Sequence, residues 1–505
     1  MAIDTSPALH LLNRPKVTFP SKPEQYAASP VPSLADWEAA WTAWDAVTQD
    51  MIPKDELLSK PIKLRNACIF YLGHIPTFLD IHLTNATDGK PTEPAYFPQI
   101  FERGIDPDVD DPEQCHAHSE IPSDWPPEHE ILDFQESVRM RVKKQYASGQ
   151  VDTDRQLRRV LWLAYEHELM HLETLLYMLI QSEKTLSPPN TIKPDFEALA
   201  QQAQKAAVPN KWFKVPAQDF TIGINDPDDN SAPEAAFGWD VEKPARNVSV
   251  GSFEIKGRPI TNGEYAAYLE QVGEKSMPAS WVEPSFTNSA DGAPNGHANG
   301  RASDSSVPSD SYIHGKTVRT VYGNVPLKYA LDWPCSASYN ELSACAAWMG
   351  GRIPTLEEAR SVYRYVEEMK REEALKAGNR TIPAVNGHLV NDGVEESPPA
   401  KSLFNGSGHG AGSNPQDLYV NLEDANVGMK HWHPVSITQN GNKLGGQGEM
   451  GGLWEWTSTP LAKHEGYSPM PLYPAYSSDF FDEKHNIVLG GSWATAPHIA
   501  GRMSL

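Results

Sequence analysis

The sequence lacks the features that mark membrane-spanning, secreted and nucleic-acid-binding proteins. No stretch approaches the ~18 consecutive apolar residues that a transmembrane helix requires. The opening residues, Met-Ala-Ile-Asp-Thr-Ser, do not combine a basic segment with an apolar one, so no secretory signal is expected. Lys and Arg number 43 against 66 Asp and Glu. The resulting formal net charge of −23 argues against nucleic acid or an anionic membrane as a partner.

Cysteine is also scarce. The four cysteines are too widely spaced for a disulfide framework or a Cys-x-x-Cys metal site, which favours a reducing, cytoplasmic compartment. They are Cys68, Cys115, Cys335 and Cys345. The length of 505 residues allows two or three domains, and no feature of the sequence indicates the oligomeric state.

The first part of the chain is predicted to be helical. Residues 1–33 contain prolines without periodicity and are expected to form an arm that packs on the rest. Residues 34–208 hold four amphipathic segments, which predict a four-helix bundle whose functional side chains face inward. The first segment starts at Ser33, and the other three are Ile62–Leu83, Ile131–Tyr146 and Gln156–Ser182. The second is expected to break or kink near Pro76.

Residues 209–505 have a different composition and predict a mixed α+β domain. Short apolar runs alternate there with Gly, Pro, Asn and Asp, and short strands are expected near residues 213 and 220. Helices are expected over Thr261–Val272 and Leu356–Lys370. Two segments, at about 287–311 and 372–401, have the composition of inserted surface segments.

The most informative motif lies in the last predicted helix of the bundle. His167 and His171, in His-Glu-Leu-Met-His-Leu-Glu, are four residues apart and therefore share one helical face. Two imidazoles at this spacing can reach one metal ion, although two core histidines bonded to backbone give the same pattern. The His-Glu-x-x-His arrangement also matches zinc hydrolases, in which Glu168 is the base. Spacing leaves the third ligand open among His74, His82 and His118.

Five further motifs, taken together, are specific. They are Phe237-Gly-Trp-Asp240, Arg258-Pro-Ile-Thr-Asn262, Gly350-Gly-Arg-Ile-Pro-Thr-Leu-Glu-Glu358, Gly452-Leu-Trp-Glu-Trp-Thr-Ser458 and Leu489-Gly-Gly-Ser-Trp493. With the histidine motif they resemble the fungal sulfoxide synthases of ergothioneine biosynthesis, from about residue 35 to the end. The resemblance implies a multidomain fold. An all-α DinB-like four-helix bundle is followed by an α+β domain of the formylglycine-generating-enzyme (sulfatase-modifying-factor, C-type-lectin-like) type.

The resemblance also implies a cofactor and a reaction. It implies non-haem Fe(2+) held by His74, His167 and His171. It makes Tyr473, in Tyr-Pro-Ala-Tyr, the proton donor and Tyr476 its neighbour, although two packing tyrosines give the same spacing. The implied reaction is O2-dependent oxidative C–S bond formation between hercynine and cysteine, rather than γ-glutamylcysteine, giving hercynylcysteine sulfoxide.

Two neighbours of the histidines also enter the comparison. Glu173 is either an acceptor for an imidazole N–H or an ordinary surface glutamate. Met170 stands where the bacterial members have a glutamine that contacts the imidazole substrate, and an apolar residue there is typical of the fungal members.

The chain departs from the family pattern at both ends. It has no N-terminal methyltransferase domain, and it stops at Leu505, where the family continues into an Asn-Trp-containing strand. We therefore expect the Gly490–Trp493 segment to be a strand without its partner and the substrate pocket to be incomplete. The alternative functions are an inactive or divergent metal-binding paralogue and a zinc hydrolase.

Overall fold

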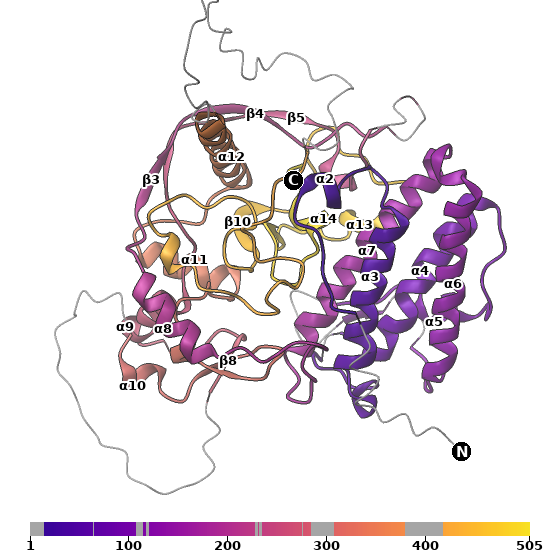
Figure 1. Cartoon of the computed structure of the whole chain (residues 1–505), viewed down its shortest axis with the longest axis horizontal. Helices are drawn as coiled ribbons and strands as arrows, with labels where there is room; N and C mark the ends of the chain where they lie inside the picture. The colour runs from indigo at the N-terminus through magenta and orange to yellow at the C-terminus, as the bar shows by residue number, and fades with distance from the viewer. Residues whose placement is uncertain are drawn as a thin grey trace, which may run out of the picture.

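The chain folds into a helical part and a part of short strands, helices and loops, which lie against each other in Figure 1. This computed structural model describes residues 15–63, 65–107, 115–117, 121–227, 231, 235–274, 276–283, 308–378 and 418–504. One cluster of buried apolar side chains extends from the helical part into the second part. The two parts are therefore joined through a shared core.

Four long helices form the helical part. They are α3 (Leu34–Asp45), α4 (Cys68–Thr87), α6 (Glu128–Ser148) and α7 (Arg155–Leu179). Helix α4 packs on both α6 and α7, and α3 packs on α7. Helix α3 begins at the predicted Ser33, which forms a reciprocal capping box with Asp36, and it continues as a π-helical turn over Ala46–Met51.

Helix α4 differs from the prediction at its start and in its middle. It begins at Cys68 rather than Ile62, and it runs through Pro76 without a break. A proline inside a helix removes one backbone hydrogen bond. Nearly every side chain from Cys68 to Asp80 is buried, so tertiary packing outweighs that loss.

Shorter elements complete the helical part and its connection. They are α2 (Pro23–Tyr26), η2 (Lys54–Glu56), α5 (Phe97–Phe101), β1 (Ile105–Pro107), β2 (Cys115–Ala117), η3 (Gln150–Asp152) and α8 (Phe196–Ala206). The predicted arm packs on the second part from residue 15 onward. Tyr26 is buried in a cluster with Val420, Leu422 and Ala500, and its hydroxyl donates to the Val420 carbonyl at 2.5 Å.

The second part is built from small antiparallel sheets. Strand β3 pairs with β6, β4 with β5 and β10 with β11, while β7, β8 and β9 form one three-stranded sheet. The strands are β3 (Trp212–Val215), β4 (Gln218–Ile222), β5 (Arg246–Val250), β6 (Phe253–Lys256), β7 (Trp281–Val282), β8 (Thr317–Val318), β9 (Val325–Pro326), β10 (Glu455–Pro460) and β11 (Asn486–Leu489). The predicted strands near residues 213 and 220 are thus confirmed.

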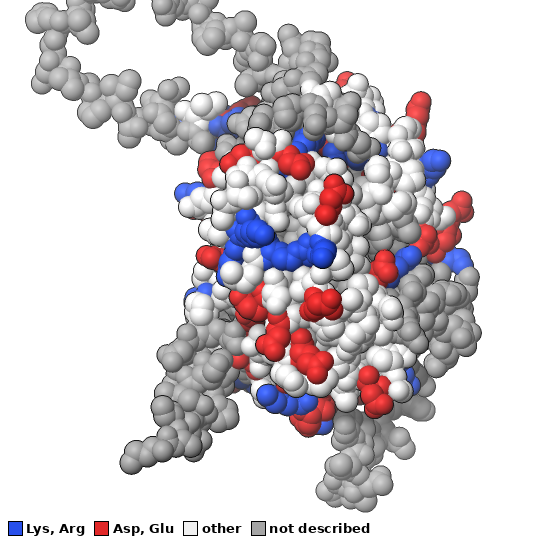
Figure 2. Space-filling model, turned by 90° about the vertical axis from the view of Figure 1, so that its right-hand side faces the viewer, with Lys and Arg blue, Asp and Glu red and all other residues white. Residues whose placement is uncertain are grey.

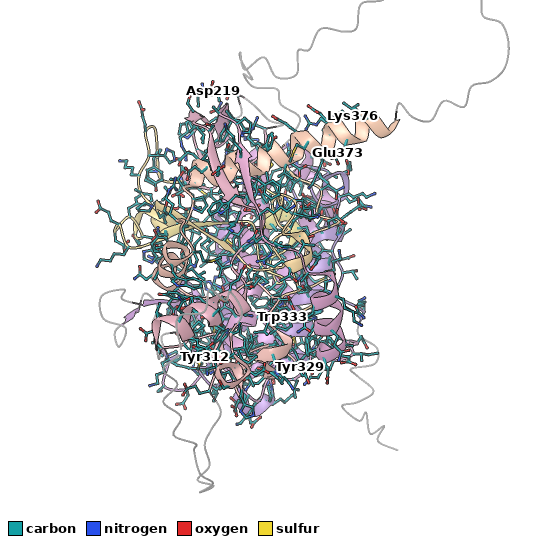
Figure 3. The ribbon with its side chains drawn as sticks, turned by 90° about the vertical axis from the view of Figure 1, so that its left-hand side faces the viewer. Asp219, Tyr312, Tyr329, Trp333, Glu373 and Lys376 are labelled. Carbon is teal, nitrogen blue, oxygen red and sulfur yellow. The ribbon has the colours of Figure 1, made fainter. Side chains whose placement is uncertain are left out.

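Helices lie around these sheets. They are η4 (Asp240–Glu242), α9 (Asn262–Val272), α10 (Asp310–Ile313), η5 (Leu327–Tyr329), α11 (Tyr339–Trp348), α12 (Leu356–Gly378), η7 (Thr438–Asn440), α13 (Ala475–Ser478) and α14 (Pro497–Ala500). Figure 3 views this part from its outer side. Asp219 of β4 and Glu373 and Lys376 of α12 lie toward one edge, with Tyr312 and Tyr329 toward the other.

The two predicted insertions fall mostly outside the described residues. Residues 372–378 belong to α12, which ends at Gly378 rather than at Lys370, and residues 308–311 include the start of α10. The helix predicted over Thr261–Val272 is confirmed as α9. It begins at Asn262, and the Thr261 side chain caps it in a capping box with Glu264.

The prediction of an unpaired strand at residues 490–493 is wrong. Strand β11 ends at Leu489 and pairs with β10, and Gly490 turns the chain with φ of 85°. A positive φ is readily adopted by glycine. The residues that follow form a loop and helix α14, and Arg502 and Ser504 are buried. The expectation of an exposed strand edge therefore loses its physical basis.

A buried carboxylate joins the two parts. Glu166 of α7 accepts hydrogen bonds from Trp162, from Trp239 at 2.6 Å, and from Arg502. Arg502 also donates to Glu242 at 3.0 Å. Asp226 is a second buried carboxylate. It accepts hydrogen bonds from Arg155, from Arg159 and from the backbone N–H of Gly238, and its ion pairs with the two arginines are also buried.

The surface carries charges of both signs. Figure 2 shows Lys and Arg side chains in small groups between Asp and Glu on the face that the helical part presents. Among the described residues, no helix combines the length and the apolar character that crossing a bilayer requires.

The hydrogen bonds around Glu166 predict that loss of the buried Arg502 lowers the free energy of unfolding more than loss of an exposed arginine does. We expect Arg502→Met to lower the free energy of unfolding by about 3–5 kcal/mol, because Glu166 and Glu242 then stay buried without their cation. Arg352→Met is the control, since Arg352 pairs with Glu358 while 65% of its side chain is exposed, and a loss below about 1 kcal/mol is expected. Urea unfolding followed by tryptophan fluorescence measures both. Equal losses would contradict the buried network's importance.

Candidate metal centre between helices α4 and α7

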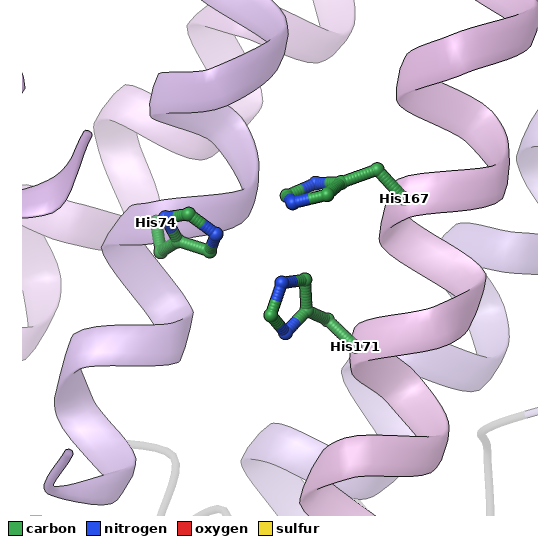
Figure 4. A group of neighbouring side chains, drawn as sticks. All are labelled: His74, His167 and His171. Carbon is green, nitrogen blue, oxygen red and sulfur yellow. The ribbon is translucent and has the colours of Figure 1, made fainter. Parts of the chain in front are cut away.

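The candidate site is built by two helices that pack against each other. Asp154 caps the start of helix α7, because its carboxylate accepts from the backbone N–H groups of Gln156 and Leu157. One turn apart on α7, His167 and His171 point toward α4, and His74 of α4 points back at them (Figure 4). The structure therefore brings together the three histidines that the resemblance had selected.

The three rings form a tight group. One nitrogen from each ring lies within 4.8 Å of the nitrogens of the other two. The ring centroids are 5.0 Å apart for His74 and His167, 4.8 Å for His74 and His171, and 4.5 Å for His167 and His171. His82 lies outside this group, since the ring of Phe78 stands beside it at 4.4 Å and stacks on His167 at 3.8 Å. His118 lies outside the described residues.

Burial keeps the three imidazoles neutral. It lowers the pKa of His74 to about 4, and it lowers the pKa values of His167 and His171 well below the ordinary range, with further lowering from the neighbouring histidines. A neutral imidazole has one nitrogen with a lone pair, which is the form that binds metal ions. Protons therefore compete little for this site near neutral pH.

A backbone carbonyl sets the tautomer of His74. Its Nδ1 lies 2.7 Å from the Phe101 carbonyl oxygen, and because a carbonyl only accepts, Nδ1–H is the donor. The lone pair is then on Nε2. Such a bond to the outer nitrogen orients a metal-binding histidine. Gly73 permits this approach, because a Cβ there would lie 2.5 Å from the Phe101 ring.

Aromatic side chains enclose the histidines. Phe70 stacks on His74 at 5.1 Å, and Tyr71 lies 5.9 Å from His171. With Phe78, these rings give the site an apolar wall that holds the imidazoles in place and limits the access of water. Sequence patterns identify Phe70 and Phe78 only as core residues, since their role depends on which residues fold against them.

The predicted tyrosines reach the site from the second part of the chain. Tyr473 lies 5.7 Å from Phe78 by ring centroids, and Phe78 stacks on His167. Tyr476 lies 5.7 Å from Tyr473, and its hydroxyl reaches the Met170 sulfur at 3.6 Å. Burial raises the pKa of the Tyr476 phenol, so this hydroxyl keeps its proton at neutral pH. Residues about 300 positions apart in the sequence are thus assembled around the histidines.

The two predicted roles of Glu173 are both wrong. Its carboxylate is partly buried and accepts from Trp454 at 2.7 Å, from Ser492 at 2.5 Å and from Thr495 at 2.7 Å. Burial raises its pKa, while these three donors act in the opposite direction. Glu173 therefore links α7 to the second part, and none of the hydrogen bonds that it accepts from the described residues comes from an imidazole.

The charged groups that act on Glu168 belong to other helices and not to the histidine group. Burial raises its pKa to about 7, and the charges that act on it are those of Arg139 and Asp45. Arg139 and Asp45 form a two-pronged ion pair on α6 and α3. A zinc hydrolase needs this glutamate beside the metal-bound water, so its position disfavours that alternative.

The donor set fits a transition metal. Three neutral imidazoles suit Fe, Zn, Cu or Ni. The Nδ1 atom of His171 is buried and has no hydrogen-bond partner among the described residues, which costs free energy unless another group satisfies it. The triad includes no carboxylate, and three ligands leave positions for exogenous groups.

Comparison with known families agrees with the architecture of the second part. The model of the sulfatase-modifying factor enzyme 1-like domain matches residues 197–504, which is more than half of the chain. The chain belongs to this family. The match begins within α8, whereas we predicted the domain boundary at residue 209, so the exact division of the chain stays a prediction.

Two fungal proteins are similar along nearly the whole chain. Ergothioneine biosynthesis protein 1 of Neurospora crassa is 56% identical over 98% of this chain and 58% of its own length. The protein of the same name from Schizosaccharomyces pombe is 33% identical, over 95% and 54%. Hercynine oxygenase of Mycobacterium tuberculosis is 27% identical, over 55% and 53%. The chain thus spans little more than half the length of these relatives.

Removal of each histidine tests the assignment of the triad. We expect His74→Ala, His167→Ala and His171→Ala each to weaken Fe(II) binding by more than about 100-fold, since two imidazoles make a poor site. His82→Ala is the matched control because it is also buried on α4. Anaerobic Fe(II) titration followed by metal analysis measures the affinities. Loss of iron in His82→Ala with retention in His74→Ala would reverse the ligand assignment.

The contact between Gly73 and Phe101 predicts an indirect effect on the metal. Gly73→Ala displaces the Phe101 ring and with it the carbonyl that orients His74, so we expect Fe(II) affinity to fall by about 10- to 100-fold. Gly104→Ala is the control, since a Cβ there meets its nearest neighbour at 3.6 Å, an ordinary contact. The same titration compares the two variants. Unchanged affinity in Gly73→Ala would show that this orientation is dispensable.

Proposed function

We propose that this chain carries out O2-dependent oxidative C–S bond formation between hercynine and cysteine, as an Fe(II) enzyme of ergothioneine biosynthesis. The proposal rests chiefly on one observation. Three neutral histidines, of which two are buried and His171 is partly buried, form one group beside Phe78, and Phe78 also contacts Tyr473 from the second part of the chain. The names of the relatives, ergothioneine biosynthesis protein 1 and hercynine oxygenase, support the same choice.

The proposed reaction balances without an external reductant. The imidazole C–H and the thiol S–H lose their hydrogens, one C–S bond and one S–O bond form, and O2 is consumed. One oxygen atom enters the sulfoxide and the other leaves as water with the two hydrogens. All four electrons taken up by O2 come from the two organic substrates.

The proposed ligands of Fe(II) are His74, His167 and His171. An iron ion held there supplies open positions for a thiolate, an imidazole and O2, and the electron transfer between them. Through its bond to the Phe101 carbonyl, His74 keeps its Nε2 lone pair available, and this nitrogen would bind the ion. The low pKa values of the three histidines keep their lone pairs available near neutral pH.

Tyr473 is the proposed proton donor. Its phenol brings a proton to an apolar site without bringing a charge. Phe78 contacts both Tyr473 and His167, with ring centroids 5.7 Å and 3.8 Å away, and its apolar ring limits the approach of water there. Met170, at the position where the bacterial members of the resembled family have a glutamine, contacts the Tyr476 hydroxyl through its sulfur.

Three further parts of the sequence prediction belong to this proposal. The helical part is proposed to be of the DinB-like kind, the protein is proposed to act in the cytoplasm, and cysteine is proposed as the sulfur donor. The alternative is a divergent paralogue that binds iron but does not form the sulfoxide. Activity on purified protein separates the two.

The direct test uses anaerobically loaded Fe(II) protein with hercynine, cysteine and air. We expect hercynylcysteine sulfoxide by mass spectrometry, with about one O2 consumed per product by the stoichiometry above. Tyr473→Phe retains the ring but loses the acidic proton, so sulfoxide formation is expected to fall by about 10²–10⁴-fold while thiol oxidation continues. Iron content serves as the control for folding of the site. An unchanged product ratio in Tyr473→Phe would move the role to Tyr476.

A further inference from the structure

The Phe-Gly-Trp-Asp motif at residues 237–240 lies beside the candidate site, although none of its side chains belongs to the triad. The indole of Trp239 stacks on Tyr476 with centroids 4.1 Å apart and an angle of 24°. Its N–H donates to Glu166 at 2.6 Å, and Glu166 precedes His167 on α7. Trp239 therefore connects the helix that carries two of the histidines to the segment that carries the tyrosines.

Asp240 holds that tyrosine segment at two points. Its Oδ2 accepts from the Tyr467 hydroxyl at 2.9 Å, and its Oδ1 accepts from the Ser477 hydroxyl at 2.5 Å. Tyr467 precedes Tyr473 by six residues and Ser477 follows it by four. Asp240 is fully buried and Ser477 is 3% exposed, so water competes little for the bond between them, while the Tyr467 bond is partly buried. One carboxylate thus closes the segment from both sides of Tyr473.

The contacts return to the histidines along two routes. Tyr473 faces Phe78, which stacks on His167, and Tyr476 reaches Met170, which precedes His171. A third contact lies nearer the surface, where Arg103 pairs with Asp479 at 2.6 Å. Arg103 is two residues after Phe101, whose carbonyl orients His74. The segment is therefore fixed relative to both helices that carry the histidines.

We propose that Trp239 and Asp240 are positioning residues that set the distance between the Tyr473 hydroxyl and the histidine triad. This inference rests on the proposed function, in which Tyr473 delivers a proton. A displacement of about 1 Å at a reacting group costs up to about 100-fold in rate. Release of one of the two bonds to Asp240 therefore lowers sulfoxide formation without touching the metal ligands.

The test uses Ser477→Ala and Tyr467→Phe, each of which removes one donor to Asp240 and leaves the other in place. Ser478→Ala is the matched control, since its hydroxyl is on the same short helix, is exposed and donates only to the Pro474 carbonyl. Three quantities are measured on the Fe(II)-loaded full chain. They are the ratio of sulfoxide to oxidised thiol, kcat and KM for each substrate, and hydrogen exchange in peptides that span residues 467–481.

We expect the sulfoxide ratio and kcat to fall by about 10- to 100-fold in Ser477→Ala and Tyr467→Phe, with KM and Fe(II) affinity unchanged and with faster exchange in those peptides. Ser478→Ala is expected to match the unsubstituted chain. A merely structural role would change exchange and melting temperature but leave the product ratio intact, and that result overturns the inference. If the unsubstituted chain forms no sulfoxide, the proposed function fails. If only Tyr473→Phe changes the ratio, the positioning inference alone fails.

Discussion

The buried carboxylate of Glu166 is the interaction on which the rest of the structure depends. Burial by itself would raise its pKa, but Arg502, His498 and the indole N–H of Trp239 together lower it below the ordinary range. A buried charge is tolerable only when it is paired and hydrogen-bonded. Glu166 adjoins His167 in the sequence, so the partners that neutralise it also hold this stretch of α7 against the second part.

The candidate site consequently belongs to neither part alone. The helical part supplies the three imidazoles and their aromatic wall, while the second part supplies Tyr473 and Tyr476. Glu173 repeats the arrangement about two turns further along α7, where it accepts three hydrogen bonds from the second part. Two carboxylates on one helix therefore fix the registration of the two parts, and the histidines lie between them.

Local patterns predicted the helices and the histidine pair but not the contacts between distant segments. His167 and His171 could be paired from spacing, because the helical period alone places them on one face. His74 and His82 share a face of α4 as well, and the distinction between them arises from Phe101 and Phe78, which no periodicity reveals.

The wrong predictions have the same origin. Glu173 was interpreted from its neighbours on the helix, yet its three donors lie about 300 residues away in the sequence. The expectation of a strand at Gly490–Trp493 came from the family resemblance, in which a neighbouring strand follows this motif. The positive φ of Gly490 ends the strand instead and directs Ser492 and Thr495 toward that glutamate.

The separation between Glu166 and its cation has a consequence for the order of folding. Arg502 follows Glu166 by 336 residues, and synthesis at about 5–20 residues per second puts about 17–67 s between their appearance. During that interval α7 exists without the arginine that neutralises its central carboxylate. The nascent helical part must keep Glu166 hydrated or protonated, and this stretch of α7 reaches its final packing only after the segment that carries Arg502, beyond α14, has been made.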